Sequence, residues 1–291
     1  MPKFGILRDH LVDIGLAQPA DFHRPEPATD AQLHTVHDAA YVAAFCNGTL
    51  GRDAMRRIGF PWAPGLVDRT RTAAGGALLA ARLALDPANP TGIACNTAGG
   101  THHAHRDFGS GFCILNDLAV AAAVLVEEDA VDQVLILDCD VHQGDGTATI
   151  FARQPRVFTC SVHCGVNFPA RKPPSDLDVD VPEFIDDDGY DAILRGDTPL
   201  FRGVDWLLEQ VEPDLVLYDA GVDVHADDRL GRLSLTDDGI TRRDTRVLEA
   251  CRAHGVPVAC VIGGGYDADH HRLAARHALL HRAAFDVAAR A

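Results

Sequence analysis

The chain has 291 residues, of which 47% are hydrophobic and 23% are charged, a composition typical of a globular protein with one large α/β domain or two smaller ones. The net charge of −16 disfavours nucleic-acid binding, because such a surface repels phosphate backbones. No apolar run reaches the ~18 residues that a membrane span needs, and the N-terminus has no signal-peptide core. We therefore expect a cytoplasmic protein that binds neither nucleic acid nor membranes, and the sequence leaves its oligomeric state open.

Five apolar runs with strand character alternate with five helix-like segments along the chain. Most runs are continuous, which is typical of strands covered on both faces. The alternation predicts one domain over residues 1–291, with a doubly wound, mostly parallel sheet and helices on both faces. The Pro- and Asp-rich stretch 169–188 is expected to be a long surface loop. The predicted strands cover residues 91–96, 133–138, 156–162, 214–221 and 256–265, and the predicted helices cover residues 69–85, 116–129, 189–211, 237–254 and 268–290.

The eight cysteines show no CxxC spacing, and most lie inside apolar runs. A zinc ribbon or a disulfide framework would need paired spacings. Free, mostly buried thiols are therefore expected.

Polar clusters follow the carboxyl ends of the predicted strands. "NTAGGTHHAHRD" follows the first strand, "DVHQGDG" the second, "HCGVNFP" the third, "DAGVDVHADD" the fourth and "GGGYDAD" the fifth. In open α/β sheets, ligands bind at that edge. We therefore expect these five loops to converge on one site.

The second of these loops contains candidate metal ligands. Asp140 and His142 share one face of an extended chain, and Asp223 is the best candidate for a third ligand from another loop. One histidine nitrogen and two carboxylates leave a coordination position open, which is typical of a catalytic zinc site, although other divalent metals tolerate the same set. The alternative is that Asp138, Asp140 and Asp145 cap a helix and line a solvated loop.

His102 and His103 are candidates for the acid and base that such a site needs, because a bound water must lose a proton and a leaving amine must gain one. Each imidazole needs a carboxylate to orient it, and Asp138 and Asp145 are available for that role. In isolation, adjacent histidines are more often solvated or core residues.

Three aromatic residues complete the candidate site. Tyr266 follows three glycines, where a phenol is placed to donate a hydrogen bond to a developing oxyanion. Phe112 and Phe168 lie in two other loops and would form the walls of a slot for an alkyl chain. Taken singly, Tyr266 is equally well explained as a packed aromatic residue, and a core position is favoured for Phe112 or Phe168. His277 and His281 have helical spacing but no HExxH motif, which favours a solvated helix face over a metal site.

The combination of four motifs resembles the histone deacetylase family with its arginase/deacetylase fold. The motifs are "GGTHHAHRDFGSGFCILND", "LDCDVHQGDG", "YDAGVDVHADDRLGRLS" and "IGGGYD". The stretches "HQGDGTATIF", "NFPARKPPSDLDV" and "DDRLGRLS" are most similar to the class IV branch, which includes many bacterial proteins. The resemblance covers roughly residues 1 to 290. It implies a central sheet of about eight strands and zinc-dependent removal of an acyl group from a lysine side chain or a related amine.

Carried over to this sequence, the resemblance implies a role for each site residue. Asp140, His142 and Asp223 match the zinc ligands, and His102 and His103 match the tandem histidines, with His103 the general base and acid. The other roles are carboxylate partners (Asp138 and Asp145), carbonyl polarisation (Tyr266), the acyl-lysine tunnel (Gly111, Phe112, Phe168 and Gly264), a structural potassium ion (Asp138, Asp140, His142, Ser161 and Val162), and a second monovalent site around Phe151, Gln154 and Val157.

Two departures from the family pattern are visible. The chain begins at "MPKFGIL", which resembles the interior of the family's N-terminal segment, so a first strand is expected to be missing or shortened and a sheet edge to be exposed. Asp219 stands where class IV relatives often have Asn, which adds an acid near Asp223.

Three other functions stay open. One is deacetylation of an acetylpolyamine or another small amide. Another is a two-metal ureohydrolase of the arginase or agmatinase kind, for which Asp219 and His225 are spare ligands and against which Tyr266 and the tandem histidines argue. The last, from a different class, is a metal-dependent binding protein without turnover.

Overall fold

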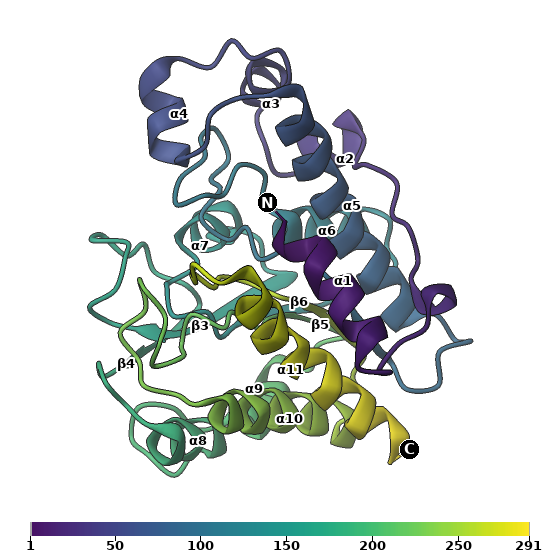
Figure 1. The fold of residues 1–291 in the computed structure, drawn as a ribbon, viewed down its shortest axis with the longest axis vertical. Coiled ribbons are helices and arrows are strands. Elements are labelled where there is room, and N and C mark those ends of the chain that lie inside the picture. The colour runs from purple at the N-terminus through teal and green to yellow at the C-terminus, as the bar shows by residue number, and fades with distance from the viewer. Residues whose placement is uncertain (1, 291) are drawn as a thin grey trace.

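The computed structural model describes residues 2–290, in which the apolar runs of the sequence form one central sheet (Figure 1). All pairings between neighbouring strands are parallel, as predicted. The strands follow the order β1-β6-β5-β2-β3-β4, which puts β1 and β4 at the edges. Their bounds are β1 (Ile93–Cys95), β2 (Val134–Asp138), β3 (Val157–Cys164), β4 (Leu177–Val181), β5 (Leu215–Asp219) and β6 (Val258–Val261).

The strand count differs from the expectation, because residues 2–290 form six strands and not about eight. One of the six, β4, lies inside the stretch 169–188 that was expected to be only a loop. Val179 and Val181 are buried, whereas Asp178 and Asp180 are exposed. This alternation is typical of an edge strand with one solvated face, and the surrounding Pro and Asp residues hide it in the sequence.

Helices cover both faces of the sheet (Figure 1). Helices α8 to α11 and α1 pack on one face, where their apolar residues form one core cluster with Leu135 and Leu137 of β2. Helices α2, α3, α5, α6 and α7 contribute to the other cluster, with Val134 and Ile136. Successive β2 side chains therefore pack in opposite cores, because neighbouring residues of a strand point to opposite faces of the sheet. The helices are α1 (Lys3–Asp13), η1 (Pro19–Asp21), α2 (Asp30–His34), α3 (Ala39–Cys46), α4 (Arg52–Ile58), α5 (Pro64–Leu85), α6 (Asp117–Glu127), α7 (Asp145–Phe151), α8 (Asp187–Arg195), α9 (Val204–Val211), α10 (Asp237–Ala253) and α11 (His270–Ala289).

Two sequence-based interpretations of helices were wrong. The predicted helix 189–211 is two helices, α8 and α9, because Gly196 and Gly203 adopt φ values of 84° and 95° between them. His277 does not lie on a solvated face, since it is 1% exposed. Helix α1 covers that side of α11, and Lys3 Nζ lies 3.4 Å from His277 Nε2. His281 is also partly buried.

The cysteines are free, as predicted, and most of them are buried.

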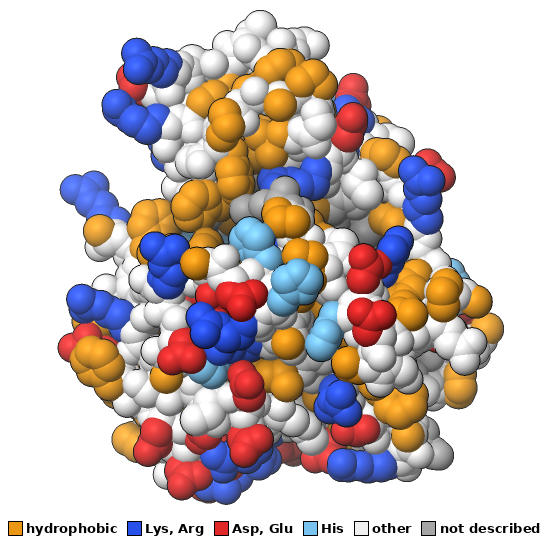
Figure 2. Space-filling view, viewed as in Figure 1, with side chains coloured by type: hydrophobic (Ala, Val, Ile, Leu, Met, Phe, Trp, Pro, Cys, Tyr) orange, Lys and Arg blue, Asp and Glu red, His pale blue; other side chains and the backbone are white. Residues whose placement is uncertain are grey.

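Within residues 2–290, no helix combines the length and hydropathy needed to cross a bilayer. On the face seen in Figure 2, hydrophobic side chains gather above the centre, histidine side chains lie at the centre, and acidic and basic side chains are interspersed below.

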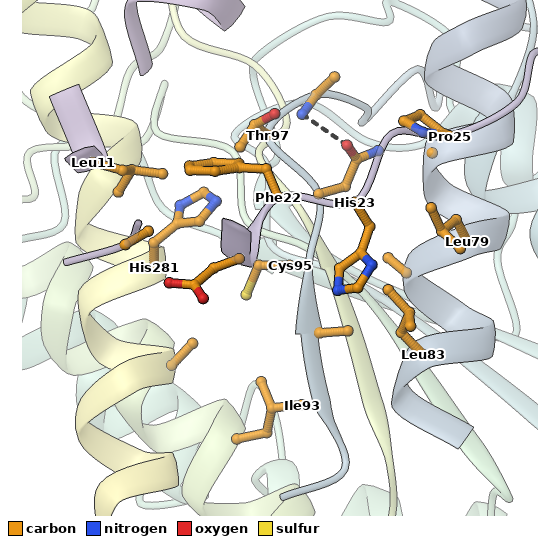
Figure 3. Close-up of a pocket in the computed structure, with 18 of the residues that line it drawn as sticks. Leu11, Phe22, His23, Pro25, Leu79, Leu83, Ile93, Cys95, Thr97 and His281 are labelled. Atoms are coloured by element: carbon orange, nitrogen blue, oxygen red, sulfur yellow. Dashed lines mark hydrogen bonds between the residues drawn. The ribbon is translucent and has the colours of Figure 1, made fainter. Parts of the chain in front are cut away.

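A cavity of about 910 Å³ lies beside the edge strand β1 (Figure 3). Leu79 and Leu83 of α5 point into it from one side, and Leu11, Phe22 and His281 line the other. None of the predicted metal ligands or catalytic residues lines this cavity, so its size does not identify the functional site.

Candidate functional site

Because all six strands are parallel, their carboxyl ends meet at one edge of the sheet, and the five polar loops converge there as predicted. The loop after β1 carries His102 and His103, and the segment after β2 carries Asp140 and His142. Asp223 follows β5, and Tyr266 follows β6. The short neighbouring strands thus bring together residues that lie up to 164 positions apart, from His102 to Tyr266.

Asp140, His142 and Asp223 form a buried group whose ligand atoms lie within 4.8 Å of one another. His142 Nδ1 lies 3.1 Å from Asp140 Oδ1 and 3.2 Å from Asp223 Oδ2. Burial by itself lowers the pKa of His142, but its hydrogen bonds to the two carboxylates raise that pKa to about 10. A buried imidazole and two carboxylates are the donors of a catalytic zinc site, so the residues fit a divalent metal.

The backbone orients both carboxylates of this group. Gly264 N–H donates to Asp140 Oδ2 at 2.7 Å, and Val141 N–H donates to Asp223 Oδ1 at 3.0 Å. A Cβ atom on Gly264 would collide with both carboxylates, so only glycine allows the backbone of that loop to approach so closely.

His102 and His103 form two parallel pairs with carboxylates, as predicted. His102 Nδ1 lies 2.6 Å from Asp138 Oδ2, and His103 Nδ1 lies 2.6 Å from Asp145 Oδ1. Since each Nδ1 is engaged, both Nε2 atoms are turned toward one another, 3.2 Å apart. Asp145 is also the first residue of α7, so the helix-terminal role and the orienting role coexist.

The electrostatic environments of the two imidazoles are different. Burial lowers the pKa of His102, but the charges of Asp138 and Asp140 more than compensate and raise it well above its ordinary value. Burial and the positive charge of His102 lower the pKa of His103 to about 4, despite the hydrogen bond to Asp145. A charged and a neutral imidazole therefore stand side by side, which divides the acid and base roles.

Asp219, noted in the sequence for its departure from relatives, lies beside His102 and Asp138. Its Oδ2 is 3.9 Å from His102 Nδ1, and neither carboxyl oxygen has a hydrogen-bond partner among the described residues. Burial raises the pKa of Asp219 well above its ordinary value, which favours the neutral acid. His225, the other spare ligand, contacts Asp227 and Asp237 and joins neither candidate metal group.

Aromatic side chains surround this group at its outer side. Phe168 meets the His103 ring edge-on at 4.9 Å, and the Phe112 ring lies 5.7 Å from that of Tyr266. Phe112 and Phe168 are 39% and 45% exposed, so they are rim residues and not core. Burial raises the pKa of Tyr266 well above its ordinary value and keeps its hydroxyl protonated as a donor. A Cβ atom on Gly111 would collide with the His103 ring.

The residues expected around potassium lie on adjacent strands. Asp138 of β2 is the register partner of Ser161 on β3, and Val162 follows it. The potassium site, like the remote one at Phe151, Gln154 and Val157, stays a prediction.

Arg243 was missed by the sequence reasoning. Its buried guanidinium donates to Cys139 O at 3.1 Å and to Gly221 O at 2.6 Å, which ties together the two loops that carry the metal-ligand candidates. It also pairs with Asp244 at 2.9 Å. A signal was present, because Arg243 shares the helical stripe of Ile240 and Val247, although a run of charged residues conceals it.

The family model of the histone deacetylase domain matches residues 3–281 of the chain. The chain belongs to the histone deacetylase family. An uncharacterized protein of Picosynechococcus sp. is 54% identical over 287 residues, which cover 99% of this chain and 92% of that protein. Histone deacetylase clr6 of Schizosaccharomyces pombe is 34% identical over 213 residues, covering 69% of this chain, which spans about half (49%) of that relative.

Solved structures of histone deacetylase homologues share the fold. A homologue complexed with SAHA has a TM-score of 0.80 at 21% identity, with 97% of this chain and 77% of that chain covered. The HD domain of HDA15 has a TM-score of 0.79 at 22% identity, covering 98% and 81%. The matches show that the chain shares the α/β fold of these structures, and assignment to the class IV branch stays a prediction.

Proposed function

We propose that this chain is a zinc-dependent deacylase that hydrolyses the amide between an acyl group and the amine of a lysine side chain or a related amine. The observation that carries this proposal is the placement of two histidine–carboxylate pairs directly beside the group of Asp140, His142 and Asp223. Membership of the histone deacetylase family supports it independently.

Asp140, His142 and Asp223 would hold the zinc ion. When bound, the ion would supply a Lewis acid that polarises the acyl carbonyl and increases the acidity of water. Two carboxylates and one imidazole suit this role, since three protein ligands leave a coordination position open for water or substrate.

The chain's own residues divide the proton transfers. His103 is neutral near pH 7, so its Nε2 accepts the proton of the attacking water, while Asp145 stabilises the resulting imidazolium. The Tyr266 hydroxyl donates a hydrogen bond to the oxyanion that develops on the acyl oxygen. A histidine of the pair then protonates the departing amine, and Asp138 holds His102 in position throughout.

The substrate class follows from the rim. Phe112 and Phe168 are exposed aromatic residues beside Tyr266 and His103, and they would form the walls of a slot for an alkyl chain. The net charge of −16 suits a cationic peptide or a polyamine carrying the acyl group. We favour acyl-lysine in a peptide, with an acylated polyamine as the second candidate, and place the reaction in the cytoplasm with potassium as a structural ion.

Two other functions have less support. A two-metal ureohydrolase would need further ligands, and His225 lies with Asp237 and not at the site. A binding protein without turnover would not need two oriented imidazoles.

The test combines turnover with metal content. A fluorogenic acyl-lysine peptide should be cleaved by the protein, chelation should stop cleavage, and zinc should restore it. Asp140→Asn should lose both zinc and activity. Absence of chelator-sensitive release from every acyl-lysine and acyl-polyamine tested would refute the deacylase, and two manganese ions per chain with urea release would favour the ureohydrolase.

A further inference from the structure

A cavity of about 260 Å³ opens between the aromatic rim and the inner side of the site. Its lining includes Phe112 and Tyr266 at the rim, and Gly264, whose backbone touches the carboxylates of the metal-ligand candidates. It also includes Lys3 and Arg69, which come from α1 and α5 and take no part in the proposed proton transfers.

Both cations line this cavity together with Tyr266. The ring centroids of Tyr266 and Phe112 are 5.7 Å apart, those of Phe112 and Phe60 are 5.3 Å apart, and the Arg69 guanidinium stands 5.1 Å from the Phe60 ring. Lys3 Nζ lies 3.4 Å from His277 Nε2, which in turn borders Gly265, the residue before Tyr266.

Neither cation is paired with a carboxylate. Among residues 2–290, Arg69 has no hydrogen-bond acceptor, and the one polar partner of Lys3 is the His277 ring. The acids nearest to Lys3 are Asp140 and Asp223, which would be engaged by the metal, and Asp228, which accepts backbone N–H groups of Leu230, Gly231 and Tyr266.

Partial burial of two like charges in one cavity is costly without an anion. Burial lowers the pKa of Lys3 to about 8, and the nearby charge of Arg69 contributes to this lowering. Two other partly buried cations are paired with carboxylates, since Arg71 lies 2.8 Å from Asp30 and Arg246 lies 2.7 Å from Asp191. The cavity therefore presents two unneutralised donors to whatever occupies it.

We propose that Lys3 and Arg69 bind the terminal carboxylate of a dicarboxylic acyl group, so that succinyl- and glutaryl-type amides are preferred substrates. This inference rests on the deacylase proposed above. Water adds to the acyl carbon, the C–N bond breaks, and the nitrogen takes a proton, which gives the free amine and a dicarboxylate. An acetyl group carries no carboxylate to pair with the cations, and an uncharged longer chain also leaves them unneutralised.

The test is a comparison of acyl groups on one lysine peptide. The values of kcat/KM for succinyl and glutaryl should exceed those for butyryl and valeryl, which have matched lengths and no charge, by about tenfold or more. Lys3→Met and Arg69→Met should each lower the succinyl-to-butyryl ratio by about tenfold, and Lys3→Arg and Arg69→Lys should recover part of it.

Arg8→Gln is the matched control, because Arg8 is exposed on α1 and pairs with Asp9. It should leave the ratio unchanged. A wild-type preference for butyryl over succinyl, or an equal effect of the Met variants on both substrates, would overturn the inference while the deacylase stands. No release from any acyl peptide would instead refute the proposed deacylase.

Discussion

Asp145→Asn separates a residue that orients a base from a residue that holds metal. The carboxylate accepts a hydrogen bond from His103 Nδ1 at 2.6 Å and contacts His105 Nε2 at 3.2 Å. Burial by itself raises the pKa of Asp145, but the hydrogen bonds to these two histidines bring that pKa below its ordinary value. The carboxyl group is therefore ionised at neutral pH. An asparagine would remove the charge that stabilises protonated His103.

The expected loss follows from the strength of that contact. A hydrogen bond to a charged group contributes about 1.5–3 kcal/mol. If this whole contribution is lost from the transition state of proton transfer, kcat/KM should fall about ten- to a hundred-fold. Zinc content should stay at the wild-type level, because Asp145 is not one of the three residues of the metal-ligand group.

The assay measures acyl-lysine hydrolysis and zinc per chain on the same preparations. Asp140→Asn should lose zinc, whereas Asp145→Asn should keep it. Asp238→Asn, which removes an exposed carboxylate from α10, should change neither quantity. Equal zinc loss in Asp140→Asn and Asp145→Asn, or full activity in Asp145→Asn, would refute the division of roles.

Three further variants test other parts of the structure. Tyr266→Phe should raise the activation barrier by about 2.7–4 kcal/mol, as loss of one oxyanion donor does, and a drop of less than tenfold in kcat would argue against that role. His37 is buried, and burial lowers its pKa to about 4, so protonation favours the unfolded state and stability is lost as pH falls from 6.5 toward 4. In urea titrations the wild type should lose about 3 kcal/mol more than His37→Gln over that interval, and parallel losses would contradict this account. Arg243→Met should lower the free energy of unfolding by about 3–5 kcal/mol, because it leaves Asp244 buried without its partner, and a change below about 1 kcal/mol would show that the pair is dispensable.

The sequence predicted the parts of the fold and site that local patterns encode. Continuous apolar runs indicated strands buried on both faces, and the polar residues after them indicated one edge, where His102, His103, Asp140 and Asp223 do meet. The potassium sites, the zinc ion and the class IV assignment stay predictions.

What the sequence missed depends on contacts between distant segments. His277 has the spacing of a surface residue, but α1 and the loop that contains Gly265 lie against it and it is buried. Lys3 and Arg69 are unremarkable until the fold points both into one cavity. The strand Leu177–Val181 was concealed because only one of its faces is apolar.

Arg243 has a consequence for engineering the metal affinity. Its guanidinium sets the spacing of the two ligand-bearing loops from α10, which packs on the sheet in the core cluster of α8 and α11. Asp244, which also accepts the Tyr218 hydroxyl at 2.7 Å, fixes that guanidinium in turn. We therefore expect conservative changes at Tyr218 or Asp244 to alter the spacing of the two loops, and with it the affinity for a divalent ion, without placing any new atom in the path of the substrate.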